Sequence, residues 1–299
     1  MTKLGIELFL NALALSLPLS IAATHVCLGF LIVLWGYEYG IKRKPVTHTF
    51  LDRPILIFLA VVLVAAVAGV NPGRSLLKVF GLWHIALVLL VVNWAPDQTR
   101  LRRLIWILFG IAALNGIYGV VQHVSGGLDL FRFNGHERIF KIGDQVRASG
   151  VFDHYMTFSG QMLLVGLLGM ALLLFWAQGR ARWFLAGAVV VFFSAVWASF
   201  TRSAWVGLGA GLLTIVLFKE RRTMIFLVVG LFLAVAVLTL ADRGFRTRAV
   251  STVKIKEGST VERFEIWRAT LDLIHDHPLL GVGIGNFSNV FDQYRERTG

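Results

Sequence analysis

Long apolar runs alternate with short polar segments along the chain. Residues 5–40 are almost wholly apolar, and because a single crossing of a bilayer takes about 20 residues, they predict two helices joined near Ser20–Thr24. Further runs predict single helices at about 54–70, 76–95, 104–123, 151–176, 183–199, 204–218 and 223–241. No run has the strict apolar–polar alternation of a membrane barrel. The pattern therefore predicts an all-α integral membrane protein with about nine transmembrane helices.

Composition supports a membrane protein and narrows its chemistry. Hydrophobic residues make up 57% of the 299 residues and charged residues 15%, against about 25% charged in soluble domains, and the mean hydropathy is +0.72. A single cysteine, Cys27, excludes an intrachain disulfide. No residue spacing matches a metal site, so no metal is expected. The net charge of +12 lies largely in short loops, where membrane orientation explains it without nucleic-acid binding.

Basic residues are divided unevenly between the two sets of alternate loops. One set holds thirteen: Lys3, Lys42, Arg43, Lys44, Arg53, Arg100, Arg102, Arg103, Arg180, Arg182, Lys219, Arg221 and Arg222. The other holds six: Arg74, Arg132, Arg138, Lys141, Arg147 and Arg202. Because cytoplasmic loops are rich in lysine and arginine, the amino terminus is expected in the cytoplasm. The loops at 71–75, 124–150 and 200–203, and everything after Asp242, are then expected to face outward.

The outward-facing carboxyl-terminal segment contains a helix signal. Ser259-Thr260-Val261-Glu262 is a capping box, and Pro278 follows as a stop signal, which predicts a helix at about 260–277. Apolar residues recur on it at spacings of three and four: Phe264, Trp267, Leu271 and Ile274. We therefore expect a transmembrane bundle over 1–241 and an outward segment over 242–299, whose amphipathic helix lies on the membrane surface or caps the bundle.

Three arginines are expected on this outward side, and each has two interpretations. Arg202 lies between two uncharged apolar runs, where it either snorkels to the headgroups or marks a functional site. Arg263 lies in the first turn of the predicted helix, as a solvated surface residue or beside an anionic ligand. Arg147 ends a basic loop that is either an interface segment or directs this arginine into a cavity. Because guanidinium matches phosphate oxygens, convergence of the three would indicate a lipid pyrophosphate.

Three segments then resemble one family. The stretches "RASGVFDHYMTFSGQML" (147–163), "SFTRSAWVGLGAGL" (199–212) and "STVERFEIWRATLDLIHDHPLLGVGIGNF" (259–287) are similar to motifs of the O-antigen ligase and polymerase family of polytopic bacterial glycosyltransferases. Within the last, "GVGIGNF" (281–287) is by itself compatible with a tight turn or an anion-binding backbone nest.

The resemblance implies roles for particular residues. Arg202 and Arg263 would be catalytic, holding the pyrophosphate and neutralising the leaving group, while Arg147, His154 and Trp267 would bind substrate. It also implies a metal-independent enzyme that uses no nucleotide or other cofactor, in the bacterial inner membrane with its active face in the periplasm. The family's general-base histidine lies further along the periplasmic loop, so the chain, which ends at Gly299, is expected to be truncated within that loop; His154 is a candidate substitute base.

The expected function is transfer of an undecaprenyl-pyrophosphate-linked polysaccharide to the lipid A-core acceptor, as in an O-antigen ligase. A polymerase of the same family would join one repeat unit to another. A transporter or flippase of an anionic or lipid-linked substrate, and a non-catalytic assembly partner, stay open as alternatives, although no inverted repeat is visible.

Overall fold

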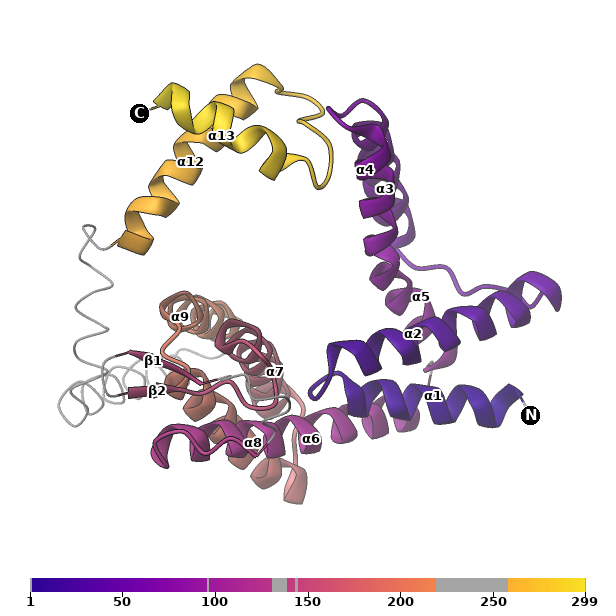
Figure 1. Cartoon of the computed structure of the whole chain (residues 1–299). Coiled ribbons are helices and arrows are strands. Elements are labelled where there is room, and N and C mark those ends of the chain that lie inside the picture. The colour runs from indigo at the N-terminus through magenta and orange to yellow at the C-terminus, as the bar shows by residue number, and fades with distance from the viewer. Residues whose placement is uncertain (1, 96, 131–138, 143–144, 219–257, 299) are drawn as a thin grey trace. The chain divides into compact units, whose positions relative to one another are not determined.

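The computed structural model describes residues 2–95, 97–130, 139–142, 145–218 and 258–298 (Figure 1). The chain divides into two compact units. One comprises residues 1–27 and 98–253, and the other comprises residues 28–97 and 254–299. Each unit is described by itself. The expected boundary at residue 241 lies outside the described residues.

The first unit is a helical bundle with a small β-hairpin. Its helices are α1 (Thr2–Ser16), α6 (Gln98–Val124), α7 (Tyr155–Phe175), α8 (Gly179–Ala198) and α9 (Arg202–Leu217). Strands β1 (Phe140–Ile142) and β2 (Gln145–Arg147) pair antiparallel in the loop between α6 and α7. This strand pair was not expected, because neither interpretation of the loop, as an interface segment or as a segment that directs Arg147 into a cavity, included strands. The helix α2 (Ile21–Trp35) runs from this unit into the other.

The core of the first unit lies where α6, α7 and α8 pack together. Phe109, Phe158 and Phe192 are fully buried there. Gly119 and Gly169 lie directly against the rings of Phe158 and Phe109, where a Cβ atom would come within 2.3 Å and 2.8 Å of a ring carbon. Small residues at such contacts let membrane helices approach closely, which explains why glycines recur in these apolar runs.

The second unit contains the remaining helices. After α2 come a π-helical turn (Gly36–Ile41), α3 (Asp52–Val67), α4 (Pro72–Val79), a 3₁₀ segment (Phe80–Ile85) and α5 (Ala86–Trp94). The carboxyl-terminal pair is α12 (Gly258–Asp276) and α13 (Phe287–Thr298). Asn71 caps α4, because its side-chain oxygen accepts from the backbone N–H of Arg74 at 3.1 Å.

Five helical stretches of the described chain are long and apolar enough to cross a membrane: Ile21–Ile41, Pro72–Trp94, Gln98–Val124, Tyr155–Phe175 and Gly179–Ala198. The protein is thus a multi-pass, helical membrane protein, but nine spans are not confirmed. The helices α1, α3 and α9 have 15 or 16 residues, which at 1.5 Å per residue is shorter than the roughly 30 Å hydrocarbon core. The span expected at 223–241 lies outside the described residues.

Candidate functional site

Several chain segments meet at one end of the first unit. The turn after α1 is bound by two helices: the Asn115 amide donates to the Pro18 carbonyl at 2.9 Å, and the Gln161 amide donates to the Leu17 carbonyl at 2.6 Å. The backbone N–H of Ala148 donates to the Ala198 carbonyl at 2.9 Å. The α1–α2 turn, the segment after β2 and the α8–α9 turn therefore belong to the same end of this bundle. The loops at 124–150 and 200–203, which contain the last two, were expected to face outward.

Two polar residues of α6 organise the segment after β2. The Gln122 side-chain oxygen accepts from the backbone N–H groups of Ser149 and Gly150, at 3.2 Å and 2.8 Å, and its amide donates to the Gly150 carbonyl. The Asn115 oxygen accepts from the Val151 N–H at 3.0 Å. Both amides are buried. They satisfy backbone groups that would otherwise be buried without partners.

Gly150 is required by this arrangement. Its φ angle is +57°, and a Cβ atom there would lie 2.3 Å from the Asn115 side-chain oxygen and 2.6 Å from the Phe158 ring. Only a residue without a side chain fits both the backbone conformation and the space. The glycine of "RASGVF" is therefore explained by close packing.

Arg147 is committed to the α8–α9 turn. Its side chain is 7% exposed. Its Nε donates to the Ser199 carbonyl at 2.9 Å, and its Nη2 donates to the Phe200 carbonyl at 3.1 Å and to Thr201 Oγ1 at 3.4 Å. The guanidinium also lies over the ring of Tyr155, at the first turn of α7. The planar fork thus joins the start of α7 to the turn that precedes α9.

The turn held by Arg147 has an unusual backbone. Phe200 has a φ angle of +51°, a conformation that costs about 1–2 kcal/mol for a residue other than glycine. Its ring is fully buried, with centroids 5.3 Å from His123 and 6.1 Å from Trp205. Packing of the ring and the hydrogen bond from Arg147 hold the residue in this conformation. Strain of this kind persists where the surrounding structure determines it and often marks functional sites.

Arg202 directly follows this turn. It is the first residue of α9 and is partly exposed. Thr201, immediately before it, is buried and accepts from the backbone N–H groups of Ala204 and Trp205 through its carbonyl oxygen. The side chain of Arg202 therefore starts from a rigid backbone at the positive end of a helix dipole. Of the three expected arginines, two therefore belong to the same site. Arg147 donates hydrogen bonds to the α8–α9 turn, and Arg202 directly follows that turn.

His154 caps the start of α7. Its Nδ1 accepts from the backbone N–H of Met156 at 3.2 Å, and its ring contacts Phe140 and Tyr155. The neutral ring then carries its proton on Nε2. His154 belongs to the same unit as Arg147 and Arg202 and follows the "RASGVF" segment by two residues.

Arg263 and Trp267 lie on α12, in the second unit. Both are exposed, Trp267 by 59%, and the Trp267 ring stacks edge-on against Phe264. The buried face of α12 is a different one, formed by Ala269 and Leu273 against α13. The expected apolar stripe is thus exposed within this unit. Arg263 shares a helix with Trp267 but not a unit with Arg202 and Arg147.

Gly283 of "GVGIGNF" packs against the turn between α3 and α4. Gly283 has a φ angle of +86°, and a Cβ atom there would lie 2.7 Å from Ser75 Oγ and 3.0 Å from the Gly69 Cα. The Val70 N–H donates to the Val282 carbonyl at 3.0 Å. This motif is therefore a tight turn that docks on another turn, the first of the two interpretations considered for it.

Asn286 stabilises the contact between the 281–287 turn and the α3–α4 turn through hydrogen bonds. Its buried amide donates to Ser75 Oγ and to the Val282 carbonyl, both at 2.9 Å, and Arg74 donates to the side chain of Asn289. The loop at 71–75 and the segment at 282–289 thus lie at the same end of the second unit, as the expected orientation requires. The sequence analysis did not identify Asn286, Asn115 or Gln122; the signal was the presence of amides inside or beside apolar runs.

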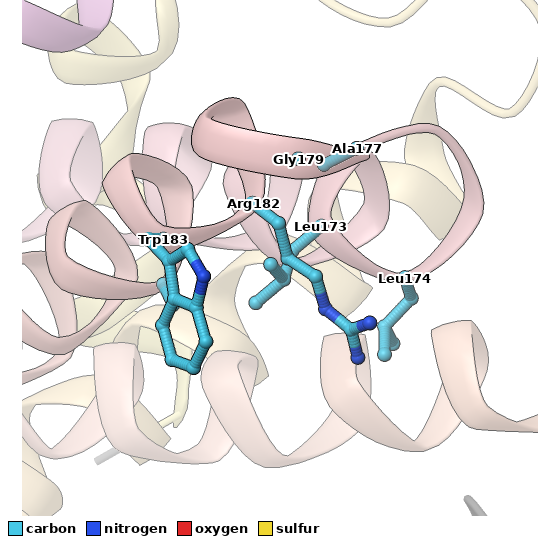
Figure 2. A pocket seen from close by; sticks show the side chains of 7 residues that line it. Leu173, Leu174, Ala177, Gly179, Arg182 and Trp183 are labelled. Carbon is cyan, nitrogen blue, oxygen red and sulfur yellow. The ribbon is translucent and has the colours of Figure 1, made fainter.

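A cavity of about 900 Å³ lies at the turn between α7 and α8. Figure 2 shows Arg182 extending along it, with Trp183 and Leu174 also in the lining. This cavity lies beside the start of α8, whereas Arg202 follows the end of α8. The 20-residue helix therefore separates the cavity from Arg202 by about 30 Å. This cavity is not part of the arginine site. Among the described residues, no group of histidine, cysteine, aspartate and glutamate could hold a metal ion.

The fold and these contacts define a multi-pass helical membrane protein in which Arg147 holds the α8–α9 turn directly before Arg202. The family model described as O-antigen ligase matches residues 187–299. This match supports the assignment of the chain to the O-antigen ligase and polymerase family, and it includes Arg202, Arg263 and Trp267. No curated protein and no solved structure matches the chain.

Proposed function

We propose that the protein transfers a polysaccharide from undecaprenyl pyrophosphate to the lipid A-core acceptor, as an O-antigen ligase of the bacterial inner membrane, with its active face in the periplasm. The observation that carries the proposal is the family match over residues 187–299, which begins in α8 and includes the turn at Arg202. The multi-pass architecture supports it, because the donor lipid is itself confined to a bilayer.

The reaction needs positive charge at a leaving phosphate. An acceptor hydroxyl oxygen attacks the anomeric carbon, the bond from that carbon to the pyrophosphate oxygen breaks, and the hydroxyl proton passes to a base. Negative charge develops on the departing pyrophosphate, where preorganised donors give a large stabilisation. We assign this role to Arg202 and Arg263, whose guanidinium groups stay charged and offer paired N–H donors.

Arg147 receives a different role from the one expected. Its Nε and Nη2 groups donate to the carbonyls of Ser199 and Phe200 and to Thr201, so we assign it as a positioning residue that fixes the direction of Arg202. His154 and Trp267 remain proposed contacts to substrate, His154 through its Nε2–H and Trp267 through its exposed ring. The resemblance places the general base later in the periplasmic loop.

Metal independence is part of the proposal. Its support is chemical: guanidinium groups at Arg202 and Arg263 supply the charge that a divalent cation supplies in many phosphoryl and glycosyl transfers. Purified enzyme that loses transfer in a chelator and regains it with one divalent cation would contradict this part.

The experiment that tests the proposed function is a gene deletion followed by complementation. For a ligase, deletion leaves the lipid A-core uncapped and strands full-length polymer on the carrier lipid, and this chain, in the form in which it is naturally made, restores capping. A core that still carries single repeat units after deletion would identify a polymerase instead. Unchanged core and carrier-linked polymer in the deletion strain would contradict both transferase functions.

A further inference from the structure

A second cavity of the first unit lies beside the α1–α2 turn and the start of α7. It has a volume of about 520 Å³, within the range of roughly 300–1,000 Å³ found for small-molecule sites. It is lined by Leu19, Ser20, Ile21, Ala22, His25, Val151, Phe152, Asp153, His154 and Thr157. Of these only His154 was singled out as a substrate contact.

The chemistry of the lining favours a neutral, hydroxyl-rich ligand. Half of the lining side chains are polar: Ser20, His25, Asp153, His154 and Thr157. They offer hydroxyl, imidazole and carboxylate groups, which donate and accept hydrogen bonds, beside the apolar surface of Val151 and Phe152. Among the residues that the structure describes, the lining has a carboxylate and no lysine or arginine.

Two helices begin at this cavity, but side chains of the protein already cap them. Ser20 Oγ accepts from the Ala23 N–H at 3.3 Å near the start of α2, and His154 Nδ1 accepts from the Met156 N–H at 3.2 Å at the start of α7. The positive helix ends therefore have partners within the chain, and Asp153 offsets the dipole of α7. The cavity is thus distinct in charge from the turn that carries Arg202.

The position of the cavity ties it to that turn. Asp153 and His154 follow Arg147 by six and seven residues, and seven residues of extended chain span at most about 25 Å. The connecting segment is fixed by the Gln122 and Asn115 amides. A glycan whose reacting end lies at Arg202 can therefore reach the cavity with its nearby sugar residues.

We propose that this cavity is a sugar-binding subsite, in which His25, Asp153 and Thr157 hold the hydroxyl groups of a sugar residue near the reacting end of a glycan. The proposal rests on the proposed transferase function for its biological role, but the binding itself does not depend on catalysis. The glycan is the accepting core or the transferred polysaccharide, which share this hydroxyl chemistry and are separated by the test.

The test uses the full chain in lipid nanodiscs with three probes: dephosphorylated core oligosaccharide, a short O-polysaccharide fragment, and inorganic pyrophosphate. Saturation-transfer NMR is expected to detect binding of one of the two oligosaccharides. Asp153→Asn and His25→Ala are each expected to weaken that oligosaccharide about tenfold, as expected for loss of a hydrogen bond to a charged or buried group. His48→Ala, a histidine of the 42–51 loop, is the matched control and leaves binding unchanged.

The oligosaccharide that binds shows whether the cavity holds the accepting core or the transferred polysaccharide. Transfer kinetics give an independent measurement. Asp153→Asn is expected to raise KM for the glycan about tenfold while the dissociation constant for pyrophosphate stays unchanged. Thr157→Val, a nearly isosteric change, gives a smaller shift in the same direction and guards against misfolding of the other variants. Failure of both oligosaccharides to bind, or binding insensitive to all three variants, would overturn the subsite. Oligosaccharide binding without any transfer by the wild type would instead overturn the proposed function and leave the subsite standing.

Discussion

Arg147 Nη2 donates to the carbonyl oxygen of Phe200 at 3.1 Å, across 53 positions of the sequence. Phe200 has the left-handed backbone conformation that turns the chain from α8 into α9. Arg202 lies two residues after Phe200. The contact therefore links the loop before α7 to the residue that we assign to the pyrophosphate, and it makes the direction of Arg202 dependent on a second, buried arginine.

Arg147→Lys tests whether this arginine acts by geometry or by charge. Lysine keeps the charge but cannot donate to two carbonyls through a planar fork. Because the carbonyls of Ser199 and Phe200 would lose buried donors, we expect a loss of about 1–3 kcal/mol of stability together with loss of transfer. Thermal unfolding in nanodiscs and a transfer assay measure the two effects. Full transfer by this variant with unchanged unfolding would contradict the positioning role.

Phe200 can be tested with a matched pair of substitutions. Phe200→Ala and Phe200→Gly remove the same buried ring, so both should be destabilised, by about 3–5 kcal/mol for the alanine variant. Glycine adopts a φ of +51° without strain, so the glycine variant should be about 1 kcal/mol more stable than the alanine variant. Their unfolding midpoints, compared directly, give the answer. An alanine variant more stable than the glycine variant would show that this backbone conformation is not the one in the protein.

The docking of the "GVGIGNF" turn predicts different tolerances at two of its glycines. Gly281 and Gly283 have φ angles of +61° and +86°, yet a Cβ atom at Gly281 meets nothing within 4 Å, whereas one at Gly283 comes within 3.0 Å of Gly69. Gly281→Ala should cost about 1 kcal/mol, and Gly283→Ala should undock the turn as well. Limited proteolysis of residues 279–286 measures this. Equal protease resistance of both variants would contradict the docked arrangement.

The contact between α12 and α13 should weaken in acid. Hydrogen bonds from the Tyr294 hydroxyl at 3.0 Å and from Arg297 at 2.9 Å lower the pKa of Asp276 below its ordinary value of 3.8. A lowered pKa stabilises the folded state above the ordinary value, and this stabilisation is lost as pH falls through the folded pKa. The protection factors of α13 amides in hydrogen exchange, which correct for the pH dependence of the intrinsic exchange rate, should therefore fall below about pH 4.

Asp276→Asn is the control for that effect. It removes the titrating carboxylate, so its α13 amides should exchange faster than those of the wild type at neutral pH and should lack this acid step. An acid step of the same size in the variant would assign it to another group.

The sequence predicted the helices well where the apolar run is long, as in α6, α7 and α8, because burial in lipid favours any such run as a helix. It also predicted helices at about 54–70 and 204–218, where α3 (Asp52–Val67) and α9 (Arg202–Leu217) lie. The charge of Arg202 in an apolar context did indicate an unusual position. The contact of Arg147 with the turn before Arg202 did not follow from the sequence. Phe200 is neither glycine nor asparagine, so nothing local indicates its left-handed conformation.

The arginine site was predicted only in part for a similar reason. Arg147 was expected to bind substrate, because the resemblance implies it and because guanidinium matches phosphate oxygens. Whether such a guanidinium binds a ligand or backbone carbonyls depends on a contact with residues 199–201, about 50 positions away. Local patterns contain no information on that pairing. The contact between Gly283 and Gly69 could not be predicted either, because these two residues are also far apart in the sequence.

The account depends most on Arg202, and one measurement tests it directly: the surface polysaccharide made by a deletion strain that expresses Arg202→Lys in the form in which the protein is naturally made. Arg180→Lys, at the opposite end of α8, is the matched control, and membrane insertion of both variants is verified by immunoblot. We expect the Arg202 variant to insert normally and leave the lipid A-core uncapped, as should Arg263→Ala, while the Arg180 variant restores capping. Normal capping by an inserted Arg202→Lys protein would contradict the assignment of the pyrophosphate to this residue.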